Sequence, residues 1–441
     1  MRKSFARYLS LATSQKPGYI IAPSGVFYPS RVSGGTPGPG VIIRPMELYG
    51  VYDVLIVGAG PGGCSAAHYL APSGLKVLMV DKATFPREKI CGDGITPRCV
   101  HNLYRMGLRE EIEGRGLRTG GIRYYSTRGG KAEARYPLGS HYPDHGYVIP
   151  RMELDRILVD HVRGLEVEVL EGCEVKTVLP GPGESVSGVT AMLEGREVQL
   201  SARYFIGADG PYPVLGKALG LTGHDPQHLG VSIRAYMRGV EGLDDHIEIY
   251  PEDAVLPACG WIFPAGEDGL ANVGVGAMLY RMNRKKMNLN RVFRDFLKDT
   301  RYASVKLKGA EILDRPRGGL MRVGLPEGRQ LKGNVVLVGD AAGMTNPFSG
   351  EGITYALESG RWAAGAVRSA AQGGGDEALK VYPQLLEEMY AHYFGRGLSS
   401  IKHGTRPVFM DPLIFTAAHN QRICDKMSRY LLNVRREEIP R

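Results

Sequence analysis

A glycine-rich turn constrains the fold of this 441-residue chain more than any other feature. The turn has the sequence GAGPGG at residues 58–63. It follows the short apolar run Val54–Val57 and precedes Cys64–Leu70, a segment rich in small residues that is typical of a helix. A second apolar run, Val77–Val80, ends at Asp81. Because such apolar runs are typical of parallel strands buried on both faces, the pattern predicts a βαβ unit of about thirty residues.

Each glycine of the turn has a separate task in such a unit. Gly58 permits the tight turn, Gly60 lets the backbone approach a pyrophosphate, and Gly63 lets the helix pack closely on the strand. The helix N-terminus supplies N–H groups and a positive dipole end for phosphates. Asp81 stands eighteen residues beyond Gly63, where a carboxylate can accept hydrogen bonds from a ribose hydroxyl. The combination predicts dinucleotide binding; a chance glycine turn is the alternative.

A second glycine-rich element, near the other end of the chain, decides between NAD and FAD. Gly339 and Asp340 close the apolar run Val335–Val338, and the sequence PFSGEG at 347–352 opens a predicted helix over about residues 352–370. A carboxylate at this point can hold a ribityl hydroxyl. The helix start can place N–H groups against the electron-accepting edge of a flavin. Because a simple dehydrogenase domain does not need this second element, the sequence favours FAD.

Composition excludes several other classes of protein. A hydrophobic content of 43% excludes general disorder, and no apolar run approaches the ~18 residues that a membrane span needs. The six scattered cysteines form no CxxC pair, which fits a reducing compartment, and the dispersed histidines predict no metal site. The formal net charge of +9 falls to +3 once residues 1–45, with six basic and no acidic residues, are left out. The charge is therefore no reason to expect a nucleic-acid partner.

Changes of pattern along the chain predict its domain organisation. Residues 1–49 are expected to be an unstructured or targeting-like extension. An FAD-binding domain is expected in two parts, 50–225 and 310–370. Strand-like segments dominate again from about residue 229, so 226–309 is predicted to be the substrate domain, and 371–441 is expected to form helices that pack over a cavity. The predicted fold class is α/β, a Rossmann-type FAD-binding domain with an interleaved antiparallel-sheet substrate domain and C-terminal helices.

Five motifs, in order along the chain, resemble those of a known family. The turn at 58–63, the segment Gly207–Gly210 and the pair Gly339–Asp340 are similar to the three FAD fingerprints of p-hydroxybenzoate hydroxylase-like flavoproteins. Within that superfamily, PREKICGDGITPR at 86–98 resembles the geranylgeranyl reductase family. So does CGWIFP at 259–264, which is followed by GVG. The combination of motifs is specific, whereas no single one is.

The resemblance, which covers about residues 50–400, implies roles for individual positions. It implies that FAD is held by Gly58, Gly60, Pro61, Gly62, Gly63, Asp81, Lys82, Cys91, Gly92, Arg151, Val175, Asp209, Asp340, Pro347, Gly350, Gly352 and Ile353. It implies that the substrate cavity is lined by Trp261, Phe263, Gly274 and Gly276. The family's aromatic motif usually opens with Tyr or Phe where this chain has Cys259, so the substrate and any role of a hydroxyl there stay open.

Several of these positions have a second interpretation. Cys91 is the catalytic candidate, as a redox or proton-donating thiol beside the flavin, or a small residue that only packs. Asp209 either contacts the cofactor or holds its own turn. Trp261 and Phe263 alternate as on one face of a strand, where they can belong to a pocket, to the sheet core or to both.

The resemblance implies FAD-dependent reduction of carbon–carbon double bonds in the polyprenyl chain of a lipid, a diphosphate or a quinone. The alternatives are a flavin-dependent monooxygenase or halogenase on the same fold, or an electron-transfer flavoprotein. The electron donor is expected to be NAD(P)H or a ferredoxin. The expected location is the cytoplasm, with a peripheral membrane contact through the C-terminal helices as a hypothesis.

Overall fold

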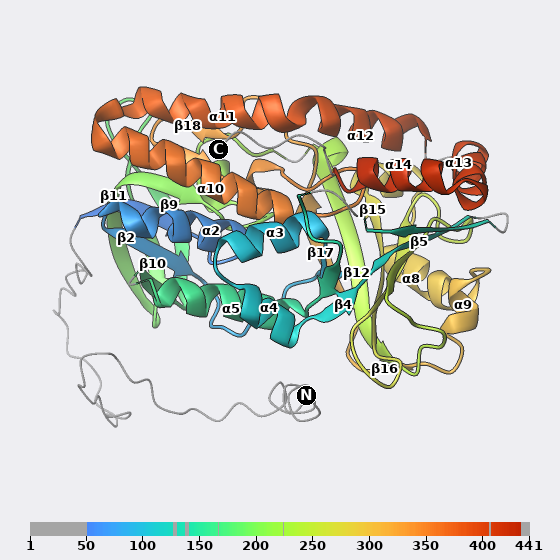
Figure 1. Ribbon diagram of the computed structural model, residues 1–441. Coiled ribbons are helices and arrows are strands. Elements are labelled where there is room, and N and C mark those ends of the chain that lie inside the picture. The colour runs from blue at the N-terminus through green and yellow to red at the C-terminus, as the bar shows by residue number, and fades with distance from the viewer. Residues whose placement is uncertain are drawn as a thin grey trace. The chain divides into compact units, whose positions relative to one another are not determined.

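The computed structural model describes residues 51–126, 130–136, 141–165, 167–223, 225–404 and 407–433, with backbone only at 403, 404 and 407–411. The extension expected at residues 1–49 lies outside these ranges. In the described part of the chain, the strands form three sheets, which helices cover (Figure 1). None of the described helices is both long and apolar enough to span a membrane.

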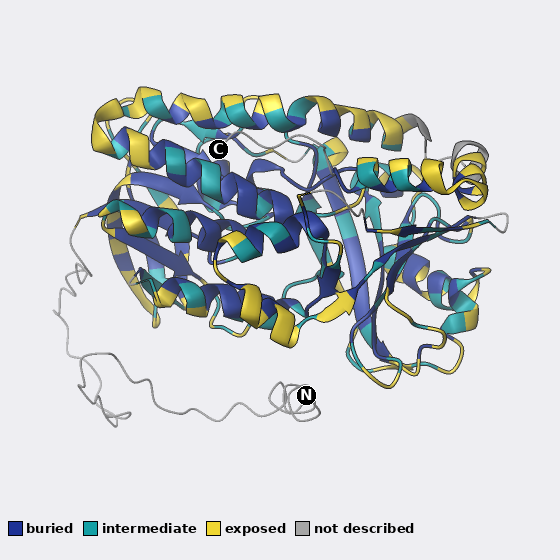
Figure 2. Ribbon diagram, viewed as in Figure 1, coloured by how far each residue is buried: buried dark blue, intermediate teal, exposed yellow. Residues whose placement is uncertain are grey.

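The first sheet contains the βαβ unit predicted from the glycine-rich turn. Its strands follow the order β18-β19-β11-β1-β2-β8, and β10 and β9 continue from β11 as an antiparallel meander. The bounds are β1 (Tyr52–Val57), β2 (Val77–Asp81), β8 (Glu168–Glu171), β9 (Cys173–Pro180), β10 (Val186–Leu193), β11 (Arg196–Gly207), β18 (Leu331–Lys332) and β19 (Val335–Leu337). β1 pairs in parallel with both β2 and β11. The apolar residues of β1 are buried, and Figure 2 shows much of this sheet in the dark blue of buried residues.

The strand β11 brings two of the glycine motifs together. This one strand contains both an alternating stretch at 197–200 and a mostly apolar stretch at 202–206. Its first half pairs antiparallel with β10, and its second half pairs in parallel with β1 and β19. Because Gly207 lies opposite Val57 in this register, the turn after β11 lies beside the turn after β1.

The helices α2 (Pro61–Leu70) and α10 (Ile353–Ser369) pack side by side (Figure 1). Small residues allow this contact: a Cβ at Gly360 would lie 2.3 Å from the carbonyl oxygen of Gly62. The Ser65 hydroxyl donates a hydrogen bond of 2.6 Å to the carbonyl oxygen of Leu357. The close packing joins the two glycine-rich elements, although Ser65 and Leu357 are 292 residues apart in the sequence.

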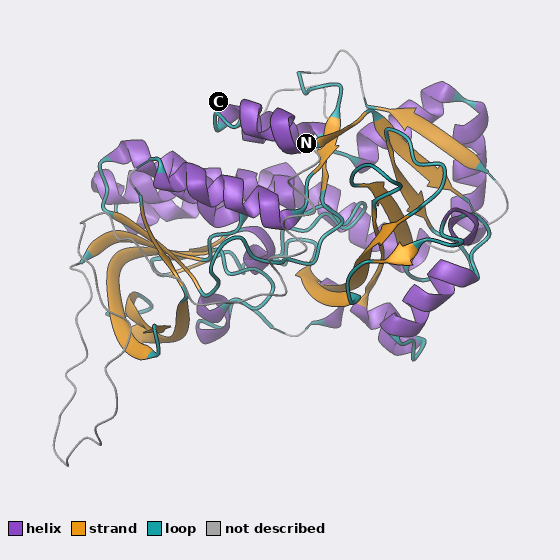
Figure 3. Cartoon of the chain, turned by 90° about the horizontal axis from the view of Figure 1, so that it is seen from below, coloured by secondary structure: helices purple, strands orange, loops and turns teal. Residues whose placement is uncertain are grey.

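The second sheet is mainly antiparallel and follows the order β16-β12-β15-β14-β13-β5-β6, with β17 paired to β12. Figure 3 shows its strands and those of the first sheet as two separate groups. Its bounds are β5 (Gly121–Tyr125), β6 (Lys131–Arg135), β12 (Leu229–Arg238), β13 (His246–Tyr250), β14 (Cys259–Pro264), β15 (Ala271–Met278), β16 (Glu311–Ile312) and β17 (Arg317–Arg322). The predicted α/β fold class with an interleaved antiparallel sheet is confirmed. However, β5, β6, β16 and β17 join this sheet from segments that the sequence placed in the FAD-binding part.

A third, small sheet and the remaining helices complete the described structure. The sheet consists of β3 (Gly94–Ile95), β7 (Gly146–Val148) and β4 (Leu117–Thr119). The other helices are α3 (Pro97–Arg105), α4 (Arg109–Arg115), α5 (Arg151–Arg163), α6 (Val214–Ala218), α7 (Leu279–Arg284), α8 (Leu289–Lys298), α9 (Ala303–Lys306), α11 (Val381–Leu386), α12 (His392–Gly404), α13 (Pro407–His419) and α14 (Gln421–Leu431). Of these, α13 and α14 pack on β6, so the end of the described chain lies against the second sheet.

Candidate functional site

A single cavity of about 1580 Å³ is lined by both large sheets and by the C-terminal helices. Its lining runs from Val57 on β1 to Asn433 beyond α14. All the residues that the resemblance assigned to cofactor or substrate line it, except Gly63 and Gly274. These two glycines pack directly against lining residues. A Cβ at Gly63 would lie 1.9 Å from the Gly58 carbonyl oxygen, and one at Gly274 would lie 2.2 Å from the Trp261 ring.

The turn at the start of α2 forms one end of the cavity. Gly58 has φ +107°, and a Cβ there would lie 2.4 Å from the carbonyl oxygen of Ala208, so only glycine fits. No side chain caps α2, which begins at Pro61 directly after Gly60. The first N–H groups of the helix are therefore available, at its positive dipole end, to an anion in the cavity.

Asp81 holds this turn in place. Its Oδ2 accepts a hydrogen bond of 2.8 Å from the Ala59 N–H, and its Oδ1 accepts one of 2.8 Å from the Ala83 N–H. The carboxylate also lines the cavity together with Lys82, Val175 and Arg151. A carboxylate oxygen has more than one lone pair, so Asp81 can hold the backbone and still accept from a ribose hydroxyl.

Cationic side chains gather beside the turn. Arg151 forms a bidentate pair with Asp155, with both N–O distances at 2.8 Å, and Arg87 reaches the same carboxylate at 2.9 Å. A Cβ at Gly60 would lie 3.6 Å from the Arg87 guanidinium, which places this cation at the expected pyrophosphate position. Sequence reasoning did not assign Arg87, although it stands in the motif at 86–98. Lys89 also lines the cavity, and burial lowers its pKa.

Asp209 leaves one carboxylate oxygen without a partner among the described residues. Its Oδ2 accepts a hydrogen bond of 2.6 Å from the Val214 N–H, which holds the turn after β11. Its Oδ1 is buried and has no hydrogen-bond partner in the described part of the chain. Burial raises the pKa of Asp209 to about 7. An unpartnered buried acceptor on a cavity wall fits a polar ligand that donates to it.

A second helix start faces the cavity at α10. Gly350, Gly352, Ile353 and Pro347 line the wall there, and no side chain caps the helix. The Thr345 hydroxyl donates a hydrogen bond of 2.8 Å to Asp340 Oδ1. Together with the turn at α2, the cations and the unpartnered Asp209 oxygen, this helix start fits FAD. The start of α2 suits the phosphates, Asp340 suits a ribityl hydroxyl, and the start of α10 suits the flavin edge.

The Cys91 thiol lies on the cavity wall above a buried polar network. Its sulfur accepts a hydrogen bond of 3.3 Å from the Asp93 N–H, and burial raises the pKa of the thiol although the Arg151 guanidinium opposes this. The fully buried Asp93 has φ +65° and accepts from the Tyr236 hydroxyl at 2.5 Å and the Asn272 amide at 2.7 Å. Burial raises the pKa of Asp93 to about 6. Sequence reasoning did not identify this carboxylate, because its partners come from distant strands.

Aromatic side chains line the cavity beside the Cys91 segment. On β14, Cys259, Trp261 and Phe263 point into the cavity, and the alternate residue Ile262 is buried in the core of the second sheet. The Trp261 indole donates a hydrogen bond of 2.9 Å to Asn272 Oδ1, which ties the wall to the Asp93 network. A Cβ at Gly92 would lie 2.8 Å from the Phe263 ring, so glycine at this position lets the ring pack closely against the Cys91 segment.

The two helix starts, the cations and the aromatic wall around one cavity define an FAD-dependent oxidoreductase with an apolar chamber beside its cofactor site. Residues 51–253 match a family model described as an FAD binding domain. The chain is 36% identical over 360 residues to a menaquinone reductase of Mycobacterium tuberculosis, covering 79% of this chain and 81% of that protein. It is 31% identical over 357 residues to a digeranylgeranylglycerophospholipid reductase of Methanosarcina acetivorans, covering 79% and 82%.

The chain belongs to the geranylgeranyl reductase family of FAD-dependent flavoproteins. The fold agrees with a solved structure, a geranylgeranyl bacteriochlorophyll reductase-like protein from Thermoplasma acidophilum. The TM-score is 0.77 at 23% identity, and the match covers 87% of this chain and 95% of that one. The predicted family, fold class and cofactor are thereby confirmed.

Proposed function

We propose that the protein reduces carbon–carbon double bonds in polyprenyl chains, with a prenylated quinone of the menaquinone type as its foremost substrate and prenyl lipids or diphosphates as further candidates. One observation carries the proposal: the FAD-binding residues and an apolar, aromatic chamber share one cavity. The relatives support the substrate class, because one is a menaquinone reductase and another acts on a digeranylgeranyl lipid by its name.

The side chains of the chamber bind and orient the alkene. Bound FAD in its two-electron-reduced form would supply the hydride that adds to one alkene carbon. Trp261 and Phe263 hold the flat, apolar double bond on one side. Buried lining residues of α12 and α13, Tyr393 and Ile414, form the other side and keep water from the reacting carbons.

Cys91 is proposed as the donor of the second hydrogen, as a proton, to the other alkene carbon. Burial raises the pKa of its thiol, so Sγ carries a proton at neutral pH. The Arg151 guanidinium stabilises the thiolate that remains until solvent reprotonates it. Cys91→Ala is expected to keep FAD and to lose about 10²-fold or more in single-turnover rate. Cys259→Ala, at another thiol on the wall, is the matched control; equal rates in Cys91→Ala and wild type would leave Cys91 a packing residue only.

The reductant that reloads the cofactor is proposed to be NAD(P)H or a ferredoxin that docks transiently. Both stay candidates, since the sequence holds no second dinucleotide fingerprint. Anaerobic mixing of the oxidised flavoprotein with each donor, followed at the flavin absorbance band, identifies the donor as the one that bleaches the band within the turnover time.

One experiment tests the proposed function directly. The purified flavoprotein is reduced with dithionite without oxygen and offered menaquinone, geranylgeranyl lipid and geranylgeranyl diphosphate. After reoxidation of any quinol ring in air, a mass gain of two units for each reduced prenyl double bond is expected in at least one substrate. No gain in any of them, together with rapid oxygen consumption by the reduced protein, would instead favour the monooxygenase or halogenase alternative.

Polyprenyl lipids and quinones reside in bilayers, so the proposal includes a peripheral contact between a cytoplasmic protein and a membrane, made by the C-terminal helices. Sedimentation with liposomes tests this contact, and an absence of binding with and without substrate would count against it.

A further inference from the structure

Large apolar side chains are exposed on α13 and α14. Of the ten large hydrophobic side chains exposed in the described part of the chain, four lie on these two helices: Leu413, Phe415, Ile423 and Tyr430. Their exposed fractions lie between 36% and 58%. The neighbouring residues Ile414, Ala417 and Cys424 are buried against β6, where the Cys424 thiol donates to the Glu133 carbonyl oxygen at 3.3 Å. The helices are thus docked through one face, and the exposed apolar residues are not part of that core.

Three of the four exposed residues also line the cavity, namely Leu413, Ile423 and Tyr430. A side chain that lines a cavity and is also exposed to solvent stands at an opening. Ile414 and Met427 line the same wall farther from solvent. An apolar chamber that opens to water between exposed apolar side chains would expose a prenyl chain at its entrance, which costs free energy unless something apolar covers the opening.

Basic residues of the same helices also line the cavity. Arg396 on α12 and Lys426 and Arg429 on α14 line the cavity, whereas none of the described cavity-lining residues of α12–α14 is acidic. Arg422 is exposed on the first turn of α14. The carboxylate on this helix, Asp425, is half-buried and accepts a hydrogen bond of 2.8 Å from Gln421. The side chains around the opening therefore carry positive charge.

We propose that this entrance surface, defined by the exposed apolar residues of α13–α14 and the basic residues around them, docks on an anionic phospholipid bilayer so that the cavity opens into the acyl-chain region. Apolar side chains with adjacent Lys and Arg match the acyl boundary and the anionic headgroups of such a surface. Each basic residue near it contributes about 1 kcal/mol of attraction. The inference rests on the proposed function, whose membrane contact it assigns to these residues and to an anionic surface.

The test is sedimentation of the FAD-loaded full chain with vesicles of phosphatidylcholine, alone or with about 30 mol % phosphatidylglycerol, whose negative surface potential attracts basic side chains. The variant combines Phe415→Ser and Arg422→Glu, two exposed residues that do not line the cavity. Val305→Ser with Lys308→Glu is the matched control, because both residues are exposed near α9, away from the opening. Reduction of a detergent-dispersed substrate is measured for every protein.

Wild type and control are expected to bind the anionic vesicles, with binding that falls as salt rises, and the Phe415/Arg422 variant is expected to bind about tenfold more weakly. All three proteins are expected to reduce the dispersed substrate equally. A variant that binds like wild type, or a wild type that binds no anionic vesicles, would overturn the docking surface and leave the reductase function intact. Vesicle binding without reduction of any substrate would overturn the reductase function and leave the docking surface intact. Dissociation of a dimer by the variant, without vesicle binding, would assign the surface to a second copy and overturn the proposal.

Discussion

Asp209 divides its two carboxylate oxygens between the turn and the cavity. One oxygen holds the backbone of Val214, and the other is buried without a partner among the described residues. The ionised form is disfavoured because water is excluded from it, which raises the pKa to about 7. In the FAD-free protein this carboxyl is therefore partly protonated at neutral pH.

This raised pKa gives a signed prediction for stability. The folded state holds the Asp209 proton more tightly than the unfolded chain, whose pKa is about 3.9, so the contribution to stability is full below that value and is lost as pH rises through about 7. Asp209→Asn removes the titrating carboxyl and therefore this pH-dependent loss of stability. The unfolding free energy of the variant minus that of wild type is expected to rise by about 2 to 3 kcal/mol between pH 5 and pH 8. Chemical denaturation of the FAD-depleted proteins at several pH values measures this difference in unfolding free energy. The exposed Asp253→Asn serves as the control, and parallel pH profiles for Asp209→Asn and wild type would contradict the prediction.

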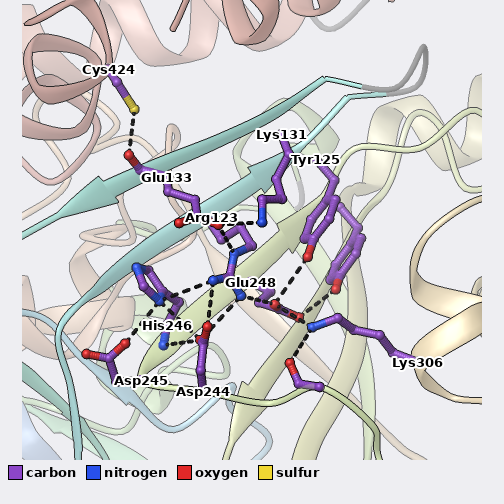
Figure 4. Close-up of polar contacts among 12 residues, drawn as sticks. Arg123, Tyr125, Lys131, Glu133, Asp244, Asp245, His246, Glu248, Lys306 and Cys424 are labelled. Atoms are coloured by element: carbon purple, nitrogen blue, oxygen red, sulfur yellow. Dashed lines mark hydrogen bonds and ion pairs between the residues drawn. The ribbon is translucent and has the colours of Figure 1, made fainter. Parts of the chain in front are cut away.

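At the scale of elements, an arginine joins three strands of the second sheet. Figure 4 shows Arg123 of β5 between Glu248 of β13, Glu133 of β6 and Asp244 beside β13, with N–O distances of 2.6, 2.9 and 2.6 Å. Glu248 is 1% exposed and also pairs with Lys306 at 2.7 Å. Two of these strands, β5 and β13, carry part of the chamber wall, so the network fixes the sheet that positions that wall.

Arg123→Met is expected to lower the unfolding free energy by about 3 kcal/mol, because it leaves the buried Glu248 with one cation fewer. Arg135→Met is the matched control on the neighbouring strand. Its side chain is 63% exposed and pairs with the exposed Asp245, so the loss should stay below about 1 kcal/mol. Urea denaturation of the three proteins measures both values, and similar losses in the two variants would argue against a structural role for the buried network.

The elements also show which parts of the fold the sequence can predict. The unit β1-α2-β2 was predictable because an apolar run, a glycine turn and a small-residue segment are local signals. The placement of β5 and β17 was not, because alternation predicts a strand but not its partner, and β5 pairs with β13, which lies far along the chain. Arg87 and Asp93 were missed at the site for the same reason: their roles come from neighbours that only the folded chain brings together.

At the scale of the whole molecule, one cavity is built from both large sheets and the C-terminal helices. The first sheet provides the cofactor turns, the second provides the aromatic wall, and α12–α14 provide the entrance. The Asp93 network links the first two, since Asn272 donates to Asp93 and to the Cys91 carbonyl oxygen and accepts from Trp261. A displacement of the aromatic wall therefore reaches the Cys91 segment through hydrogen bonds.

Because the described cavity is built from residues 57–433, we predict that the residues before the first described strand are dispensable for catalysis. A chain that begins at Met46 is expected to bind FAD in full stoichiometry and to reduce the same substrate at the same rate, because β1 begins at Tyr52 and the described lining of the cavity begins at Val57. The truncation removes six positive charges and lowers the net charge from +9 to +3. Its binding to anionic vesicles should therefore weaken only at low salt, where long-range attraction is unscreened. The flavin absorbance per chain, single-turnover rates and sedimentation at two salt concentrations measure these three expectations, and loss of FAD or of turnover in the shortened chain would contradict the assignment of the site to residues 57–433.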